Sequence, residues 1–411
     1  MDQLTTIDTE RENRAPLGFK EFVGLVAAMM ALTALGIDSM LPALPAIGDS
    51  LDVATANHRQ YVITSFLIGF AFAQLVYGPL SDRFGRRPVL LVALGAYVLT
   101  SAVAAISGSF ELLLLSRAAM GTAAAGARVV TVALVRDCYS GRAMARVMSL
   151  AFIVFMAAPI VAPNFGELML LFGNWRLIFW GVAGVSGLVM LWFWLRMPET
   201  MSADARQSLH PARIARDYAL VMKDRAAVGY TLAITLLSGG MFGFIGSIQQ
   251  IMADVFHQPK LLTVMFAAVA SMMAVGAYMN SRLVMRLGMR LISHSALAVL
   301  IVLAGLHLLV AWSGAESLWT FGILQGAMML FIALANANFS AMAMERMGDI
   351  AGTASSLQGF TTTLGGALIG ALIGQAFNGT TVPLYAGFFI LGVLAFGIIA
   401  VAERGRLFRA T

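Results

Sequence analysis

Twelve apolar stretches, each about twenty residues long, follow one another along the chain and limit what it can fold into. A helix needs roughly twenty apolar residues to cross about 30 Å of hydrocarbon. Because a segment in lipid has to pair its own backbone polar groups, stretches of this length predict an all-α integral membrane protein with twelve transmembrane helices. The stretches fall near 21–44, 60–80, 88–107, 111–135, 145–172, 177–196, 227–250, 261–281, 291–312, 317–341, 353–376 and 383–402.

The low charge content supports this prediction and excludes several other classes. Charged residues make up only 12% of the 411 residues, whereas soluble domains carry about a quarter. The net charge of +6 does not indicate a nucleic-acid partner, because the basic residues sit between apolar stretches and form no continuous patch. The single cysteine, Cys138, excludes an intramolecular disulfide and a cysteine-based metal cage. We therefore expect no metal site.

The uneven distribution of lysine and arginine predicts the topology. If the amino terminus is inside, 22 of the 27 basic residues fall in cytoplasmic segments and only three fall in outer loops, namely Arg59, Arg176 and Lys260. Basic residues next to spans are retained on the cytoplasmic side. The first twenty residues are polar and do not resemble a secretory signal peptide. Both termini are therefore expected in the cytoplasm.

A polar interruption after the sixth span divides the chain into two halves. The segments 78–87 (GPLSDRFGRR) and 281–290 (SRLVMRLGMR) share leucine, arginine, glycine and arginine in register, each after the second span of its half. Such a duplication is a known plan of transporters. Within the interruption, a basic amphipathic piece is typical of a helix that lies on a membrane surface. We expect a tail over 1–20, two pseudo-symmetric six-helix bundles over 21–197 and 227–402, a cytoplasmic linker over 198–226 and a tail over 403–411.

The first of these loops also carries the most specific motif. Gly-Pro-Leu-Ser-Asp-Arg-Phe-Gly-Arg-Arg-Pro at 78–88 resembles the cytoplasmic loop signature of the major facilitator superfamily. Its glycines allow a tight reversal of the chain. Other segments resemble, more narrowly, the Bcr/CflA branch of drug:proton antiporters, over nearly the whole chain. They are DSMLPALP at 38–45, RAAMG at 117–121, VRD at 135–137, AP at 158–159 and 162–163, WRLIFW at 175–180 and MPET at 197–200.

Two positions depart from this resemblance. The branch often has a tyrosine where this chain has Met40, and it tends to keep small residues where this chain has Glu167. Both positions lie where cargo could bind, so the cargo of the branch is not carried over to this chain.

The resemblance implies a major facilitator fold and a proton-coupled secondary transporter that exports amphipathic small molecules, including antibiotics, by alternating access. It implies a bacterial inner-membrane protein, which we expect to be a monomer, with protons, small-molecule cargo and membrane lipid as partners. It needs no cofactor beyond the proton gradient. The alternatives are a proton-coupled importer or a dedicated metabolite exporter on the same fold and, more distantly, a membrane enzyme or sensor.

Other mechanisms lack their motifs. The chain has no GxxxxGK[ST] loop for ATP, no nucleophile elbow and no HExxH helix. It also has no filter repeat of a channel. We therefore expect a carrier and not an enzyme.

Four charged residues fall inside the predicted spans, where charges are costly and usually functional. They are Asp38, Arg117, Arg128 and Glu167, all in the first half. Asp38 and Arg117 are each about six residues from the outer end of an oppositely directed span, so they should lie at similar depth. We predict that Asp38 binds the coupling proton or a cationic cargo group, that Arg117 favours its ionised form and that Glu167 is a second proton site. A structural ion pair of Asp38 with Arg117 and an interfacial role for Glu167 are the alternatives.

Arg128 could instead cap carbonyl groups, and a lone histidine such as His307 in the ninth span is more often a hydrogen-bonded packing residue.

Two further groups of residues are predicted from their positions. A cytoplasmic gate of salt bridges should involve Gly78, Asp82, Arg83, Gly85, Arg86, Arg87, Arg136 and Asp137. Polar, aromatic and methionine side chains at the depth of a cargo cavity are candidates for substrate binding, namely Tyr61, Phe66, Phe70, Gln74, Met156, Gln249, Asn336, Asn338 and Gln358.

Overall fold

The computed structural model describes residues 16–201 and 211–409. Within these ranges the chain forms twelve helices of twenty residues or more, which confirms the predicted all-α membrane fold. They are α2 (Phe19–Asp38), α4 (Tyr61–Phe84), α5 (Arg86–Ala105), α6 (Phe110–Cys138), α7 (Gly141–Phe172), α8 (Arg176–Arg196), α10 (Arg225–Gln250), α11 (Leu262–Leu287), α12 (Met289–Trp312), α13 (Leu318–Met344), α14 (Ala351–Gln375) and α15 (Val382–Ala402).

Length and composition suit these helices to a membrane. Among the described residues, eleven helical segments are long and apolar enough to cross a bilayer. The remaining long helix, α7, has a shorter apolar part over Ala157–Phe172. Its two prolines, Pro159 and Pro163, lie inside the helix. Prolines inside membrane helices are tolerated because neighbouring groups pair the freed backbone carbonyls.

Short elements connect the long helices. In the first half they are η1 (Leu41–Ala43) and α3 (Leu44–Ser50) after α2, and η2 (Ala56–Gln60) before α4. In the second half they are α9 (Pro211–Lys223), η4 (Ile251–Val255), η5 (Pro259–Leu261) and η6 (Gly348–Ile350).

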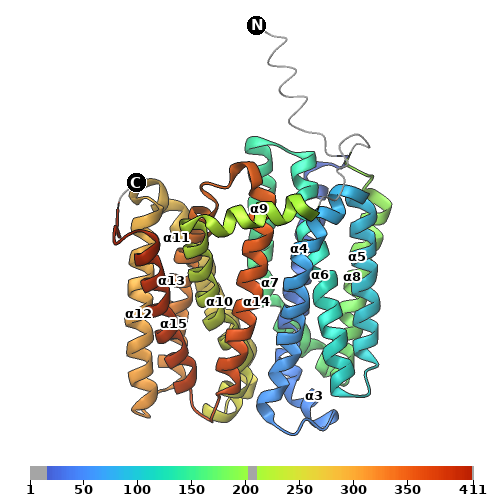
Figure 1. Cartoon of the computed structure of the whole chain (residues 1–411). Helices are drawn as coiled ribbons and strands as arrows, with labels where there is room; N and C mark the ends of the chain where they lie inside the picture. Colours follow the sequence, from blue (N-terminus) through green and yellow to red (C-terminus); the bar gives the residue numbers. More distant parts are fainter. Residues whose placement is uncertain (1–15, 202–210, 410–411) are drawn as a thin grey trace. The chain divides into compact units, whose positions relative to one another are not determined.

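The contacts divide the chain into two compact units. The first unit comprises Met1–Asp52 and Ser65–His210, and the second comprises Val53–Thr64 and Pro211–Thr411. Within each unit the long helices run roughly parallel to one another (Figure 1). Below, the end of each unit is named after an arginine: the Arg86 end, where α5 begins, and the Arg290 end, near the start of α12.

Helix α9 lies in the segment predicted as a linker and belongs to the second unit. In Figure 1 it crosses the Arg290 end and does not continue the direction of α10. One side of α9 is anchored, because Val221 is buried in a small apolar cluster with Ala227, Met347 and Ala354. The neighbouring residues Leu220 and Met222 are exposed. This two-sided character is that of an interfacial helix.

Glycines bring α4 and α6 into backbone contact in the first unit. A Cβ atom at Gly69 would lie 1.9 Å from the carbonyl oxygen of Ala118, and one at Gly121 would lie 1.9 Å from that of Phe66. The Thr122 hydroxyl also donates a hydrogen bond of 3.3 Å to the Gly69 carbonyl. Membrane helices associate largely through such close packing of small residues.

Close packing at glycines also joins α10 and α14 in the second unit. A Cβ atom at Gly370 would lie 2.8 Å from the backbone nitrogen of Gly243, and one at Gly365 would lie 2.4 Å from the Thr235 methyl group. The glycines of α14 therefore permit close helix approach.

The two repeated loops have matching backbones. Gly85 precedes α5 with φ 99° and ψ 160°, and Gly288 precedes α12 with φ 79° and ψ 157°. Positive φ values of this kind favour glycine, which lacks a Cβ atom. The register found between residues 78–87 and 281–290 thus corresponds to a repeated local structure.

We predict that Gly121→Ala destabilises the first unit, because its methyl group would overlap backbone atoms of α4 that cannot rotate away. Overpacking of this kind costs about 1–3 kcal/mol. Thermal denaturation of the detergent-purified protein measures the effect. Gly184→Ala in α8 is the matched control, because nothing lies within 4 Å of a Cβ atom there. Equal stability of the two variants would contradict the close α4–α6 crossing.

Candidate functional site

Arg86 is the centre of a charged cluster in the first unit. Its Nη1 donates hydrogen bonds to Asp82 Oδ1 at 2.6 Å and to Ser81 Oγ at 2.7 Å. Its Nε donates to Asp137 Oδ2 at 2.8 Å. The side chain of Arg86 is buried, so two carboxylates and a hydroxyl compensate its charge. The cluster joins the ends of α4, α5 and α6.

Glu199 completes the cluster from the segment that follows α8. Its carboxylate accepts hydrogen bonds from the backbone nitrogens of Arg86 at 3.0 Å and Arg87 at 3.2 Å. A negative charge is favourable at the amino-terminal end of a helix, here α5. Gly85 is needed beside it, because a Cβ atom there would lie 2.4 Å from Glu199 Oε2. Arg87 adds a hydrogen bond of 2.8 Å from its Nε to the Met197 carbonyl.

The predicted gate residues are therefore brought together only in part. Asp82, Gly85, Arg86, Arg87 and Asp137 belong to the cluster. In the sequence, Glu199 belongs to the segment 197–200 that carries the resemblance and is not predicted as a gate residue. Glu199 could have been predicted from the sequence, because it follows the sixth span directly and lies on the same side as the arginine-rich loop at 83–87.

The other predicted gate residues have different surroundings. Arg83 is exposed, and its guanidinium carbon lies 5.2 Å from the centroid of the Phe84 ring. Arg136 is exposed. The Gly78 carbonyl accepts a hydrogen bond of 2.9 Å from the Ser81 hydroxyl. Gly78 lies inside α4, where the chain does not reverse, and it helps to hold Ser81 near Arg86.

The second unit has a charged cluster at the corresponding loop, centred on Arg290, which the repeat aligns with Arg87 and not with Arg86. Arg290 Nε donates to Glu403 Oε1 at 3.1 Å, and its Nη2 donates to Glu345 Oε2 at 3.2 Å. Glu345 follows α13 much as Asp137 ends α6, and Glu403 follows α15 much as Glu199 follows α8. The acidic residues that bind these arginines therefore also follow corresponding helices in the two units.

Asp38 lies at the end of α2 and is only 4% exposed. Its Oδ1 has no hydrogen-bond partner, and it forms no ion pair within residues 16–201 and 211–409. Next to it, a Cβ atom at Gly166 of α7 would lie 2.0 Å from the Ser39 carbonyl oxygen. Asp38 is therefore a buried carboxyl group beside a tight helix crossing.

Arg117 is fully buried in the same unit and is surrounded by aromatic rings. Its guanidinium carbon lies 4.7 Å from the Phe66 ring centroid and 5.9 Å from that of Phe179. Its Nη1 lies 3.9 Å from Met120 Sδ. Stacking on aromatic faces is favourable for a guanidinium group in a site of low water content.

Helix geometry explains why Asp38 and Arg117 do not pair here. A Cβ atom at Gly36 would lie 3.0 Å from the ring of Phe66, the same ring on which Arg117 stacks. Residues two apart on an α-helix project about 200° from each other. Asp38 is therefore directed away from the face of α2 that meets Phe66 and Arg117.

The remaining charges of the predicted spans differ in their surroundings. Glu167 on α7 is exposed. Arg128 is half-buried, and its guanidinium carbon lies 5.9 Å from the Phe70 ring centroid. Buried charge also occurs in the second half, where the Glu316 side chain is 6% exposed. Buried charge is therefore not limited to the four charged residues of the predicted spans, because Glu316 reaches His307 of α12 from the loop between two spans.

The candidates for cargo binding also separate by their partners. The Asn338 side chain already has a partner within the protein, because its Nδ2 donates a hydrogen bond of 2.7 Å to Asn280 Oδ1. Asn336 Oδ1 and Gln358 Nε2 are buried atoms with no hydrogen-bond partner in the described part of the chain. The same holds for both amide atoms of Gln325, which the sequence analysis did not single out. Unsatisfied buried amides of this kind could bind a ligand.

The other predicted cargo residues differ in burial, and the side chain of one of them is not described. Phe66 and Phe70 are buried, and their ring centroids are 6.3 Å apart. Tyr61 is half-buried and stacks on His58, and Gln74 is half-buried. Gln249 is buried. The side chain of Met156 lies outside the described part of the structure.

Four amide side chains form a second polar feature, which we call the amide clasp: Asn57, Gln60, Gln250 and Gln375. Gln60 Nε2 donates to Gln250 Oε1 at 2.5 Å, and Gln250 Nε2 donates to Asn57 Oδ1 at 2.7 Å. Gln375 Nε2 donates to the Asn57 carbonyl at 2.8 Å, and Asn57 Nδ2 returns a bond of 3.0 Å to the Gln375 carbonyl. The clasp holds residues 53–64 to α10 and α14, away from the Arg290 end.

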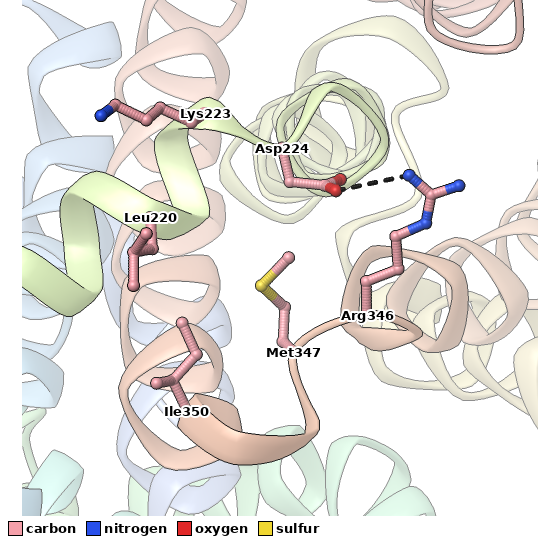
Figure 2. Close-up of a pocket in the computed structure, with 6 residues that line it drawn as sticks. All are labelled: Leu220, Lys223, Asp224, Arg346, Met347 and Ile350. Atoms are coloured by element: carbon pink, nitrogen blue, oxygen red, sulfur yellow. Dashed lines mark ion pairs between the residues drawn. The ribbon is translucent and has the colours of Figure 1, made fainter.

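A pocket of about 430 Å³ lies at the Arg290 end of the second unit. It is lined by α9, the start of α10 and the loop after α13, and Figure 2 shows Asp224 facing Arg346 across it. Their ion pair measures 3.6 Å between Arg346 Nη1 and Asp224 Oδ2. None of the predicted cargo residues lines this pocket.

Comparisons with known proteins agree on one family. The Major Facilitator Superfamily model matches residues 26–370. A bicyclomycin resistance protein homolog of Haemophilus influenzae is 31% identical over 376 residues, which cover 88% of this chain and 91% of that protein. Multidrug resistance protein D of Escherichia coli is 28% identical over 366 residues, covering 85% of this chain and 88% of that protein.

A further relative and a solved structure agree. A chloramphenicol resistance protein of Pseudomonas aeruginosa is 37% identical over 180 residues, covering 43% of this chain and 42% of that protein. The structure of a bacterial homolog of the human lysosomal transporter Spinster matches with a TM-score of 0.73 at 15% identity, covering 93% of this chain and 96% of that chain. This likeness concerns the fold.

The chain spans the membrane, takes a small-molecule substrate and is a transporter and not an enzyme. It belongs to the Major Facilitator Superfamily, as the loop motif and the duplicated six-helix plan predict.

Proposed function

We propose that this protein exports amphipathic small molecules, antibiotics among them, from the bacterial cytoplasm in exchange for protons. The relatives named for bicyclomycin, chloramphenicol and multidrug resistance support export of drugs. The observation that carries the proton coupling is the buried carboxyl group of Asp38, whose Oδ1 has no hydrogen-bond partner in the described part of the chain.

Asp38 suits exchange because its carboxyl group has no counter-ion among the residues that the structure describes. An ionised carboxylate buried without a partner costs several kcal/mol. The group is therefore stable inside the protein only when it holds a proton or faces a cationic or hydrogen-bonding part of the cargo. Proton and cargo then compete for the same oxygen atoms, which is the coupling that antiport requires.

Arg117 is proposed to contribute a fixed positive charge within the same unit, on a face that Asp38 does not contact directly. Its guanidinium group is held by Phe66 and Phe179, so its position does not depend on an ion pair with Asp38. A fixed cation in a medium of low dielectric constant lowers the energy of an ionised carboxylate over several ångströms. Arg117 would thereby stabilise Asp38 during the interval between proton release and cargo binding. Glu167, being exposed, is the weaker candidate for a second proton site.

For topology, we propose that the Arg86 and Arg290 ends face the cytoplasm and that the chain acts as a monomer in the inner membrane. The bias of basic residues toward these ends supports this orientation. The Arg86 cluster would then be a cytoplasmic gate, and the amide clasp would be a gate on the outer side. Alternating access requires two packings that differ by only a few kcal/mol, and hydrogen-bonded amides can separate at small cost once water enters.

We predict that Asp38→Asn abolishes gradient-driven export, because the amide cannot carry an exchangeable proton. In everted vesicles with an imposed proton gradient, uptake of bicyclomycin or chloramphenicol should fall at least about tenfold, equivalent to about 1.4 kcal/mol. Glu167→Gln is the matched control and should retain most of the uptake.

Two results of this assay would contradict the proposal. Full uptake by Asp38→Asn would remove Asp38 from the coupling step. Proton movement with the cargo, and not against it, would instead indicate a proton-coupled importer.

We predict that locking the amide clasp stops transport. In a Cys138→Ser background, Gln60→Cys and Gln250→Cys can be joined by a short, reducible bis-thiol reagent. Joined protein should lose export, and a reductant should restore it, because the segment before α4 can no longer leave α10. Each single-cysteine variant treated with the same reagent is the control. Continued export by the joined protein would show that the clasp does not open during the cycle.

A further inference from the structure

A buried histidine and glutamate form a pair in the second unit, far along the chain from Asp38. His307 of α12 and Glu316 of the following loop approach to 2.7 Å between Nε2 and Oε1. Their side chains are 0% and 6% exposed. The transport scheme above uses neither residue, so the pair requires a separate explanation.

Aromatic and hydroxyl groups surround the pair. The Thr381 hydroxyl donates a hydrogen bond to Glu316 Oε2. The Tyr385 ring stacks on the imidazole with 3.4 Å between ring centroids, and the Phe321 ring packs edge-on at 6.1 Å. His307 Nδ1 has no hydrogen-bond partner within the described ranges. Both oxygens of the carboxylate are thus satisfied, while one imidazole nitrogen stays open.

These contacts give the pair two protonation states with opposing costs. With a neutral imidazole, Nε2–H donates to the carboxylate and the pair carries one negative charge in an apolar setting, which is unfavourable. With a second proton, on Nδ1, the pair is neutral overall, but the buried Nδ1–H lacks an acceptor, which is also unfavourable. Since histidine changes charge near neutral pH, a change in the surroundings of the pair can move it from one state to the other, with the gain or loss of a proton.

The other titratable groups near this end are few in the described structure. Tyr385 faces the pair from α15. After α10, Asp254, His257 and Lys260 lie in exposed positions. In residues 53–64, which contact the ends of α10 and α14, His58 is exposed and Arg59 is half-buried. The arginines of α11, Arg282 and Arg286, lie within its last six residues, at the Arg290 end, whereas His307 lies within the last six residues of α12, at the opposite end.

We propose that His307 and Glu316 form a second proton-binding site, separate from Asp38 and located at the end of the second unit opposite Arg290. The ligand is a proton that the pair takes up as a unit at Nδ1 of the imidazole and releases to water. With the orientation proposed above, this site is reached from the outside. It links the packing of α12, the loop at 313–317 and α15 to the pH on that side.

Nitrogen NMR of the detergent-purified full chain, labelled with ¹⁵N at its histidine rings, tests this site directly. The chain has five histidines, and His307→Gln identifies the signal of His307 by its loss. Between about pH 5 and about pH 9, where histidines exchange protons, the His307 signal should titrate. In Glu316→Gln its midpoint should shift by about one pH unit or more, because the carboxylate that stabilises the cation is gone.

Conservative variants separate a proton site from a merely structural pair. Glu316→Asp keeps a carboxylate and should restore a midpoint closer to that of the unmodified protein, and it serves where Glu316→Gln fails to fold. Tyr385→Phe keeps the stacked ring and should leave the titration unchanged. A His307 signal that does not titrate in this range would overturn the proposal. So would a midpoint that is the same with and without the carboxylate, because histidine would then act alone.

Discussion

The cost of an uncompensated charge in a medium without water governs most of this structure. Arg86 is buried between two carboxylates, and Arg117 is buried against aromatic rings. His307 is buried against Glu316. Asp38 differs from all of these, since it is buried and lacks an ion pair within the described residues. A charge that the protein does not compensate itself must be compensated by something that comes and goes, and a proton and a cargo molecule are both of that kind.

The duplicated plan places a charged cluster at the same loop of the two units, although the repeat aligns Arg290 with Arg87 and aligns Arg86 with Met289. Each unit has an arginine after a left-handed glycine, an acidic residue at the end of its fourth long helix and another after its sixth. The units nevertheless differ in detail, because the position equivalent to Asp82 is Met285, whose side chain is exposed. In the proposed cycle this difference gives the Arg86 cluster more bonds to break than the Arg290 cluster, so the two ends of the repeat need not open with equal ease.

The sequence was sufficient to predict the features that depend on composition and local spacing. The twelve spans, the two halves and the glycine turns follow from apolar length, from a repeat and from the need for positive φ. Features that depend on how helices rotate against one another were not predictable. The sequence predicts similar depths for Asp38 and Arg117, but the directions of their side chains around the helices decide that Phe66 lies beside Arg117. The amide clasp was missed for the same reason, since its partners are more than 180 residues apart.

Proton release on cargo binding tests the central claim most directly, because it needs neither a membrane gradient nor an assumption about orientation. Purified protein in weakly buffered detergent is mixed with bicyclomycin or chloramphenicol, and a pH-sensitive dye records the change. If cargo and proton compete at Asp38, the unmodified protein should release protons in proportion to the cargo bound, and Asp38→Asn should bind cargo without releasing them. Cargo binding without proton release by the unmodified protein, or an equal release from Asp38→Asn, would contradict the account.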